Sequence, residues 1–146
     1  MEYIMRTIIA ITVTILFLLS CEKYDVDEKT MVIKYGTVCE MGYDSLTISG
    51  NDLWYTGVSN FDGNRIDRHE NLSENEKESL ISTLDKKEFA KINLNSCFVC
   101  VDGCDNWITV QDKNFFHKIR YAEYDSLEVA PIEDFINQLY LLKLKF

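Results

Sequence analysis

The sequence predicts an α+β fold in which two helices cover one face of an antiparallel sheet, with the element order β-β-β-α-β-β-α. Three observations support this fold class: short β-branched and aromatic runs separated by turn residues, a helix-capping signal, and an apolar stripe with helical spacing near the C-terminus. The chain has 146 residues, of which 27% are charged and one is proline, a composition typical of a globular protein rather than a disordered chain.

Three short strands are expected before the first helix. Residues 31–35 read MVIKY and residues 45–49 read SLTIS, both rich in residues that favour strands. The turn residues 50–52 separate the second run from residues 53–56, which read LWYT. This alternation of strand and turn signals favours an antiparallel meander. Residues 61–71 are polar and are predicted to form a loop or an irregular edge.

A capping box predicts where the first helix begins. Ser73 and Glu76 have the spacing at which each side chain satisfies the backbone N–H group of the other residue. The apolar residues that follow are expected to pack against the sheet, and they are Leu80, Ile81, Leu84, Phe89 and Ile92.

The C-terminal part of the domain is predicted to be strand, turn, strand and helix. Residues 107–111 form the first of these strands, residues 112–114 a tight turn, and residues 115–124 the next strand. Alternate residues of that strand share one face, namely Phe115, His117, Ile119 and Tyr121. Pro131 suits the first turn of a helix. The stripe that this helix buries is predicted to contain Ile132, Phe135, Ile136, Leu139 and Tyr140.

The N-terminal region has the features of an export signal. Residues 7–19 are uncharged and apolar, which is too short for a span that needs about 20 apolar residues, and Arg6 provides a positive flank. The sequence Leu18-Leu19-Ser20-Cys21 resembles the lipobox of bacterial lipoproteins. That resemblance implies a lipid on the Cys21 thiol and cleavage before Cys21. Two or three acyl chains on that residue would hold a protein stably in a membrane.

The predicted organisation therefore has three parts. Residues 1–20 are a cleaved lipoprotein signal peptide, residues 21–30 a lipidated acidic tether, and residues 31–146 a single α+β domain. The predicted location is the bacterial cell envelope, with the lipid anchored in the outer membrane and the domain on its periplasmic or surface face.

Four further cysteines, Cys39, Cys97, Cys100 and Cys104, are candidates for disulfides. An even number of cysteines in an exported domain favours structural disulfides, with Cys39 joined to one of the other three and the remaining two paired. A first alternative is a zinc site formed by these thiolates, in which His117 could replace one of them. A second alternative is a redox pair of Cys97 and Cys100 in their C-x-x-C arrangement.

The segment from Cys97 to Ile108 resembles a motif, C-x-x-C-x-D-G-x-x-x-W-I, in a family of small uncharacterised bacterial lipoproteins. The matching residues are Cys97, Cys100, Asp102, Gly103, Trp107 and Ile108. This chain departs from the family in having Cys104 where the family has glycine, and in lacking a second cysteine near Cys39. The resemblance implies a fold and a protein class but no activity, because the family has none assigned.

No catalytic pattern is present, and the chain is predicted not to be an enzyme and to bind no cofactor or metal. His69 and His117 are the only histidines, and neither a nucleophile elbow nor a phosphate-binding glycine loop occurs. The formal net charge of -9 excludes nucleic acid as a partner, because phosphates require a basic surface.

The function predicted from these observations is that of a lipid-anchored binding or structural accessory protein, which contacts the membrane through its lipid and recognises an envelope protein or a glycan. Aromatic residues near the expected turns are candidates for that contact, although core packing is their more common role. They are Tyr43, Trp54, Tyr55 and Phe61. The alternatives are an envelope inhibitor or immunity-type protein that binds a basic enzyme, or a thiol or zinc protein.

Overall fold

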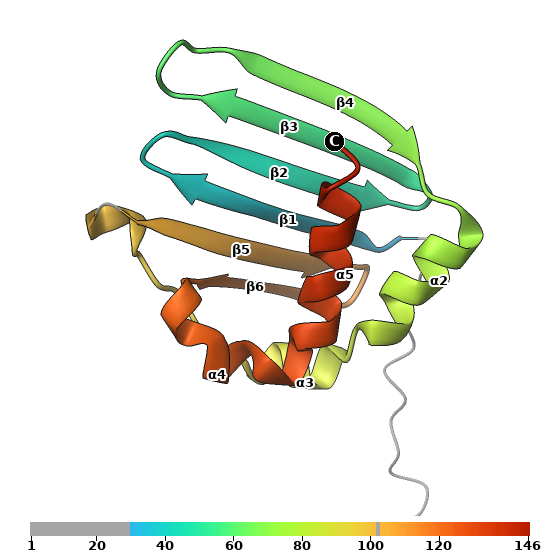
Figure 1. Ribbon diagram of the computed structural model, residues 1–146. Helices are drawn as coiled ribbons and strands as arrows, with labels where there is room; N and C mark the ends of the chain where they lie inside the picture. Colours follow the sequence, from blue (N-terminus) through green and yellow to red (C-terminus); the bar gives the residue numbers. More distant parts are fainter. Residues whose placement is uncertain (1–29, 102) are drawn as a thin grey trace, which may run out of the picture.

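A computed structural model describes residues 30–101 and 103–146 and shows a six-stranded antiparallel sheet with helices packed on one face (Figure 1). The strand order across the sheet is β4-β3-β2-β1-β5-β6. The six strands are β1 (Val32–Cys39), β2 (Gly42–Ser49), β3 (Asp52–Ser59), β4 (Arg65–Asn71), β5 (Cys104–Gln111) and β6 (Phe116–Tyr121). The helical segments are α2 (Glu74–Thr83), α3 (Lys86–Lys91), the single turn α4 (Ser126–Val129), α5 (Glu133–Lys143) and three short 3-10 turns at Val99–Val101, Glu123–Asp125 and Ala130–Ile132.

The α+β class is confirmed, but the predicted element order is wrong in three places, one of which is the additional single-turn helix α4 before α5. Residues 65–71 form a fourth strand, β4, within the segment predicted to be a loop or irregular edge. The predicted first helix is two helices, because the chain turns extended at Leu84 and a second helix begins with Asp85 as its N-cap. Two helices were expected on one face of the sheet, whereas the structure has four, α2, α3, α4 and α5. All four supply residues to one core.

The β4 strand was missed because its own sequence carries no burial pattern. All seven of its residues are exposed, so no alternation between apolar and polar residues marks it. Pairing with β3 creates the strand, as in the register pair Leu53 with Glu70. Its charged side chains suit an edge strand, because they oppose pairing with a second chain.

The core lies between the sheet and the helices. Alternate residues of the strands point to this face, and the buried ones are Ile33, Tyr35, Leu46, Ile48, Leu53, Ile108, Val110, Ile119 and Tyr121. The helices add Leu80, Phe89, Phe135, Leu139 and Leu142. Of the predicted C-terminal stripe, Tyr140 is instead 50% exposed, and Leu142 takes its place in the core.

The capping signal and two strand residues can be located in the structure. The capping box at the start of α2 is confirmed, since the Ser73 hydroxyl accepts from the Glu76 N–H group and the Glu76 carboxylate accepts from that of Ser73. His117 faces the core side, and its Nε2 lies 2.8 Å from the Ile92 carbonyl oxygen. On the opposite face of the sheet, Gly36 is buried because the Trp107 ring covers it.

The predictions made for residues 1–29, including lipidation at Cys21, lie outside the residues that the structure describes. Within residues 30–101 and 103–146, no helix has the length and apolar character needed to cross a bilayer.

Candidate binding groove

A groove of about 380 Å³ lies on the helix side of the sheet, where the helices do not cover it. In Figure 1, α5 crosses the sheet near its middle and leaves exposed the ends where the β1–β2 and β3–β4 hairpins turn. We call this depression the hairpin-end groove. Its lining residues come from β1 to β4 and their turns, and they are Thr37, Cys39, Met41, Gly42, Tyr43, Asp44, Tyr55, Gly57, Val58, Ser59, Asn64 and Ile66.

Two glycines contribute to the hollow. Gly42 has a φ of 151°, and a Cβ at this position would lie 2.2 Å from the Val58 carbonyl oxygen, so no other residue fits without moving the backbone. A Cβ at Gly57 would lie 3.0 Å from the Tyr55 hydroxyl oxygen, so a larger side chain here would fill space beside that ring. Glycine within a strand often marks a place where another molecule approaches the backbone.

Exposed apolar side chains surround the groove. Met41 is 62% exposed, Ile66 51% and Phe61 78%, and Phe61 also lines a neighbouring depression shared with Glu40, Met41 and Asn60. Large apolar side chains that gather on one part of a surface are characteristic of binding sites.

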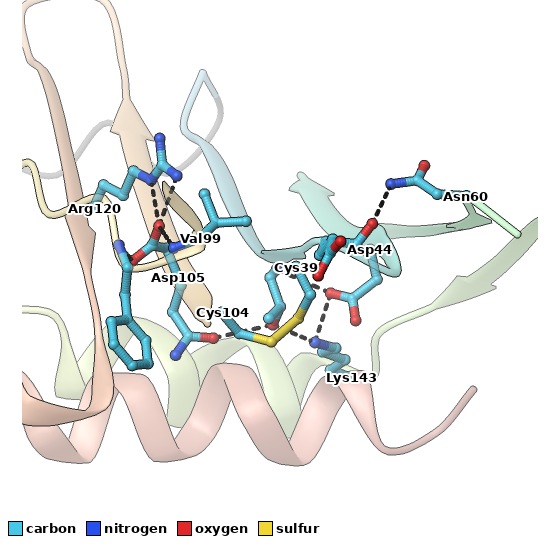
Figure 2. The surroundings of a disulfide bond; sticks show 12 residues. Cys39, Asp44, Asn60, Val99, Cys104, Asp105, Arg120 and Lys143 are labelled. Carbon is cyan, nitrogen blue, oxygen red and sulfur yellow. Dashed lines mark hydrogen bonds and ion pairs between the residues drawn. A yellow bond between two sulfur atoms is a disulfide. The ribbon is translucent and has the colours of Figure 1, made fainter. Parts of the chain in front are cut away.

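The inner end of the groove is polar and is held by an ion pair with α5. Asp44 Oδ1 lies 2.6 Å from Lys143 Nζ and accepts a 3.0 Å hydrogen bond from the Thr37 N–H group. Lys143 also donates to the Thr37 hydroxyl, which donates in turn to Asn106 Oδ1. Figure 2 shows Lys143 reaching from the helix to Asp44 beside the Cys39–Cys104 disulfide. This end therefore offers an organised set of polar groups next to an apolar surface.

Two tyrosines near this end remain protonated hydroxyls over a wide pH range. Burial, the Asp44 carboxylate and Tyr140 together raise the pKa of Tyr35 to about 12. Burial and the same carboxylate also raise the pKa of Tyr55, while Arg68 opposes this shift. Tyr55, which lines the groove, can thus act as a neutral hydrogen-bond donor.

The predicted aromatic candidates divide between two faces. Tyr55 lines the hairpin-end groove from the helix side, and Phe61 lies next to the groove at the hairpin tip. Tyr43 also borders the groove, but it pairs with Val58, which alternates with Tyr55 along β3, so its side chain belongs to the face opposite the helices. Trp54 also lies on the face opposite the helices, where its ring stacks on His69 with centroids 3.9 Å apart. Trp54 is 51% exposed and Tyr43 is 44% exposed, so neither takes the core position that is the commoner role of such residues.

The four candidate disulfide cysteines form two pairs, Cys39 with Cys104 and Cys97 with Cys100. The first joins residues 65 apart in sequence, across neighbouring positions of β1 and β5, and the second joins residues only three apart. In the chain-entropy model the long loop contributes about 4 kcal/mol and the short one about 2 kcal/mol. The Cys39–Cys104 bond is therefore the larger constraint on the unfolded chain.

A zinc site would need free thiolates, whereas all four of these cysteines are joined in the two disulfides. Among residues 30–101 and 103–146, no three histidine, cysteine or acidic side chains are grouped so as to hold a metal ion. His117, the suggested fourth zinc ligand, instead contacts the Ile92 carbonyl oxygen and the Phe89 ring.

A second polar cluster lies on the other face of the sheet, around the buried Asp105. This carboxylate accepts hydrogen bonds from the Phe98 and Val99 N–H groups and from Arg120, whose Nη2 is 2.6 Å away (Figure 2). Burial by itself would raise the pKa of Asp105, but these four hydrogen bonds outweigh it and hold the pKa below its ordinary value. The cluster fastens the loop that contains Cys97 and Cys100 to the start of β5.

Sequence reasoning missed the groove itself. Gly42 and Gly57 were not identified as residues that leave space for a groove. Met41 and Ile66 lie in no sequence pattern that predicts exposed side chains. A glycine two residues after Tyr55 in a strand-like run was the signal that could have pointed to a close approach. The pairing of four strands was also needed to bring both hairpin turns to one place.

Comparison of the sequence with models of known protein families, and with curated proteins, finds no match. The resemblance to small lipoproteins through Cys97, Cys100 and Trp107 therefore stays a prediction.

Proposed function

We propose that this chain is a lipid-anchored binding protein of the bacterial cell envelope, held at Cys21, which recognises an exported protein through the hairpin-end groove. The observation that carries this proposal is the groove of about 380 Å³ with exposed Met41, Phe61 and Ile66 around it. The lipobox-like segment before Cys21 supports the anchor, and the tether of residues 21–30 would keep the domain close to the membrane.

The charge around the groove indicates a basic partner with a protruding apolar side chain. Glu40 and Asp62 lie in the two hairpin turns, and Arg65 is already paired with Asp67. The whole chain has a net charge of -9, which would steer a cationic protein toward it. An apolar side chain of such a partner would enter between Met41 and Ile66, while its cationic neighbours would face the acidic turns.

An inhibitor or immunity-type protein is the second candidate function, and the same acidic turns favour it. Such a protein binds a basic enzyme through complementary charge, so the two candidates share a surface and differ in what the partner does. An assay of the partner's activity with and without this protein separates them once the partner is identified.

Site-specific photocrosslinking in the native envelope tests the binding surface. A photoreactive phenylalanine analogue replaces Phe61 in the full chain, and the matched control replaces Leu127, an equally apolar side chain that is 86% exposed on α4. We expect one discrete adduct from position 61, absent from position 127, that weakens at high salt because charge steers the association. A Gly57→Val substitution should reduce the adduct by filling the groove. Equal adducts from both positions, or none from position 61, contradict the proposed surface.

The anchor has its own test. Cys21→Ser should remove the lipid from the intact mass, whereas Cys39→Ser should leave the lipid in place. A Cys21→Ser variant that still carries the lipid mass contradicts the anchoring part of the proposal.

A further inference from the structure

The Cys97–Cys100 disulfide differs from its companion in what it connects. Cys39–Cys104 joins two neighbouring strands of the sheet, whereas Cys97–Cys100 closes a three-residue separation within the loop before β5. Both Cys97 and Cys100 are exposed. Opening this bond would therefore detach no strand or helix from the fold, and a thiol in solution has direct access to it.

Other contacts hold this loop in place without the disulfide. Asp105 accepts from the N–H groups of Phe98 at 2.8 Å and Val99 at 3.1 Å, and the Gly103 N–H group donates to the Phe98 carbonyl at 3.1 Å. The preceding Ser96 N–H group donates to the Arg120 carbonyl on β6. The two sulfur atoms should consequently stay close to each other after reduction, ready to pair again.

Arg120 places a positive charge beside one of the two sulfurs. Its Nη2 lies 3.7 Å from Cys97 Sγ, while the same guanidinium donates to the buried Asp105. A neighbouring guanidinium favours the thiolate form of a cysteine and so makes that sulfur the better leaving group. Asp105 holds the guanidinium in this position, which assigns the stabilised thiolate to Cys97 rather than Cys100.

We infer that Cys97 and Cys100 form a thiol–disulfide exchange site for exported dithiols, in which Cys97 is the thiol stabilised by Arg120. A thiolate of the dithiol attacks Cys100 Sγ, the Cys97–Cys100 bond breaks, and its electron pair goes to Cys97 as a thiolate beside Arg120. The second thiolate of the dithiol then attacks the first sulfur of the dithiol, which is held in the mixed disulfide with Cys100. This closes the disulfide of the dithiol and releases Cys100 as a thiolate. The dithiol is oxidised to a disulfide, and Cys97 and Cys100 are reduced and take up the two protons.

The surface beside the disulfide can receive such a partner. Phe98 lies between the two cysteines, is 37% exposed, and meets the 63% exposed Tyr124 edge to face with centroids 5.5 Å apart. The Phe98 ring rests on Gly103, where any Cβ would collide with it. This aromatic pair offers a fixed apolar contact next to the reactive sulfurs.

Timed reduction of the full chain in detergent tests the inference, with dithiothreitol as the dithiol. Freed thiols are alkylated under native conditions and assigned by peptide mass mapping. We expect Cys97 and Cys100 to be labelled at least about tenfold faster than Cys39 and Cys104, because Cys104, although exposed, is joined to the half-buried Cys39 between two paired strands, whereas both Cys97 and Cys100 are exposed in a loop. Opening of both disulfides at the same rate, or of Cys39–Cys104 first, overturns the inference.

A reductant with a single thiol shows which sulfur is attacked. With 2-mercaptoethanol we expect the mixed disulfide on Cys100 and a free thiol on Cys97, and the reverse distribution overturns the assignment of Cys97 as the leaving group.

Arg120→Gln tests the role of the guanidinium, with Lys118→Gln as a matched loss of charge from the same strand. We expect Arg120→Gln to slow reduction of Cys97–Cys100 by about threefold to tenfold and Lys118→Gln to leave it unchanged. Arg120→Lys, which keeps the charge and disturbs Asp105 less, should recover part of the rate. The continued protection of Cys39–Cys104 reports that each variant is folded. An Arg120→Gln rate equal to that of the wild type overturns the role of Arg120.

Discussion

Substitution of Asp105 by asparagine is predicted to destabilise the domain substantially. The Asp105 side chain is fully buried, and its two oxygens accept four hydrogen bonds, two from backbone N–H groups and two from Arg120. Asparagine keeps the shape but removes the charge and presents an NH2 group where donors already point. Arg120, whose side chain is only 26% exposed, would then lose its counter-charge.

The size of the effect follows from these contacts. Removing one partner of a buried ion pair costs about 3–5 kcal/mol, and the partial exposure of Arg120 places this case near the lower value, about 3 kcal/mol. A domain of this size has a total stability of about 5–15 kcal/mol, so the loss is a large share of it. With a urea dependence of about 2 kcal/mol per molar, the unfolding midpoint should fall by about 1.5 M.

Urea unfolding under non-reducing conditions, followed by circular dichroism and tryptophan fluorescence, measures this change. Asp67→Asn is the matched control, because Asp67 also accepts two hydrogen bonds from an arginine, Arg65, but on the exposed edge strand. We expect no resolvable shift for the control, since water replaces an exposed ion pair at little cost. If the urea midpoints of Asp105→Asn and Asp67→Asn agreed within about 0.3 M, burial would not be what makes the Asp105–Arg120 ion pair stabilising.

Two further predictions concern charge and stability. Stability should fall in acid, below about pH 5, because three carboxyl groups have pKa values below their ordinary range. The pKa of Glu76 drops from 4.5 to about 2 beside Lys145 and Ser73, and the pKa values of Asp105 and Asp112 are also lowered. A carboxyl group whose pKa is lower in the folded state than in the unfolded state stabilises the fold fully at pH values above its unfolded-state pKa. That stabilisation is lost as the pH falls through its folded-state pKa. Urea midpoints at several pH values check this, and Glu76→Gln should flatten the acid limb. Lys86→Met should lower stability by about 3 kcal/mol, since Asp112 would be left as a buried charge without the Lys86 ammonium, and a midpoint shift under about 0.5 M would argue against it.

Much of the sheet and the start of α2 could be predicted because their signals are local, whereas Pro131, predicted in the first turn of the last helix, lies in the 3-10 turn that precedes α5. The β2 and β3 strands extend beyond residues 45–49 and 53–56, but the predicted runs lie inside them. The Ser73 capping box involves only neighbouring residues, so its outcome does not depend on distant contacts. The break between α2 and α3 was less visible, because Leu84 and Phe89 both face the core on either side of it.

The groove and the polar clusters could not be predicted in the same way. Asp44 and Lys143 are 99 positions apart in the numbering and meet only because α5 crosses β2 on the core side. The predicted strand of residues 107–111 begins after Asp105, whereas the place of Asp105 in β5 beside Arg120 makes it a buried acceptor for the cysteine loop. Such contacts depend on strand order, which the spacing of residues along the chain does not contain.

By itself the sequence determined the α+β class, the capping of α2 and an even set of four cysteines available to pair, because alternation, capping and residue type are properties of short segments. Only the tertiary structure decided that β4 is a strand, that Cys39 pairs with Cys104, and that two hairpin turns enclose a groove beside α5. The physical reason is that β4 has no buried residue of its own, that Cys39 and Cys104 meet only where β1 pairs with β5, and that the groove forms only once four strands lie side by side.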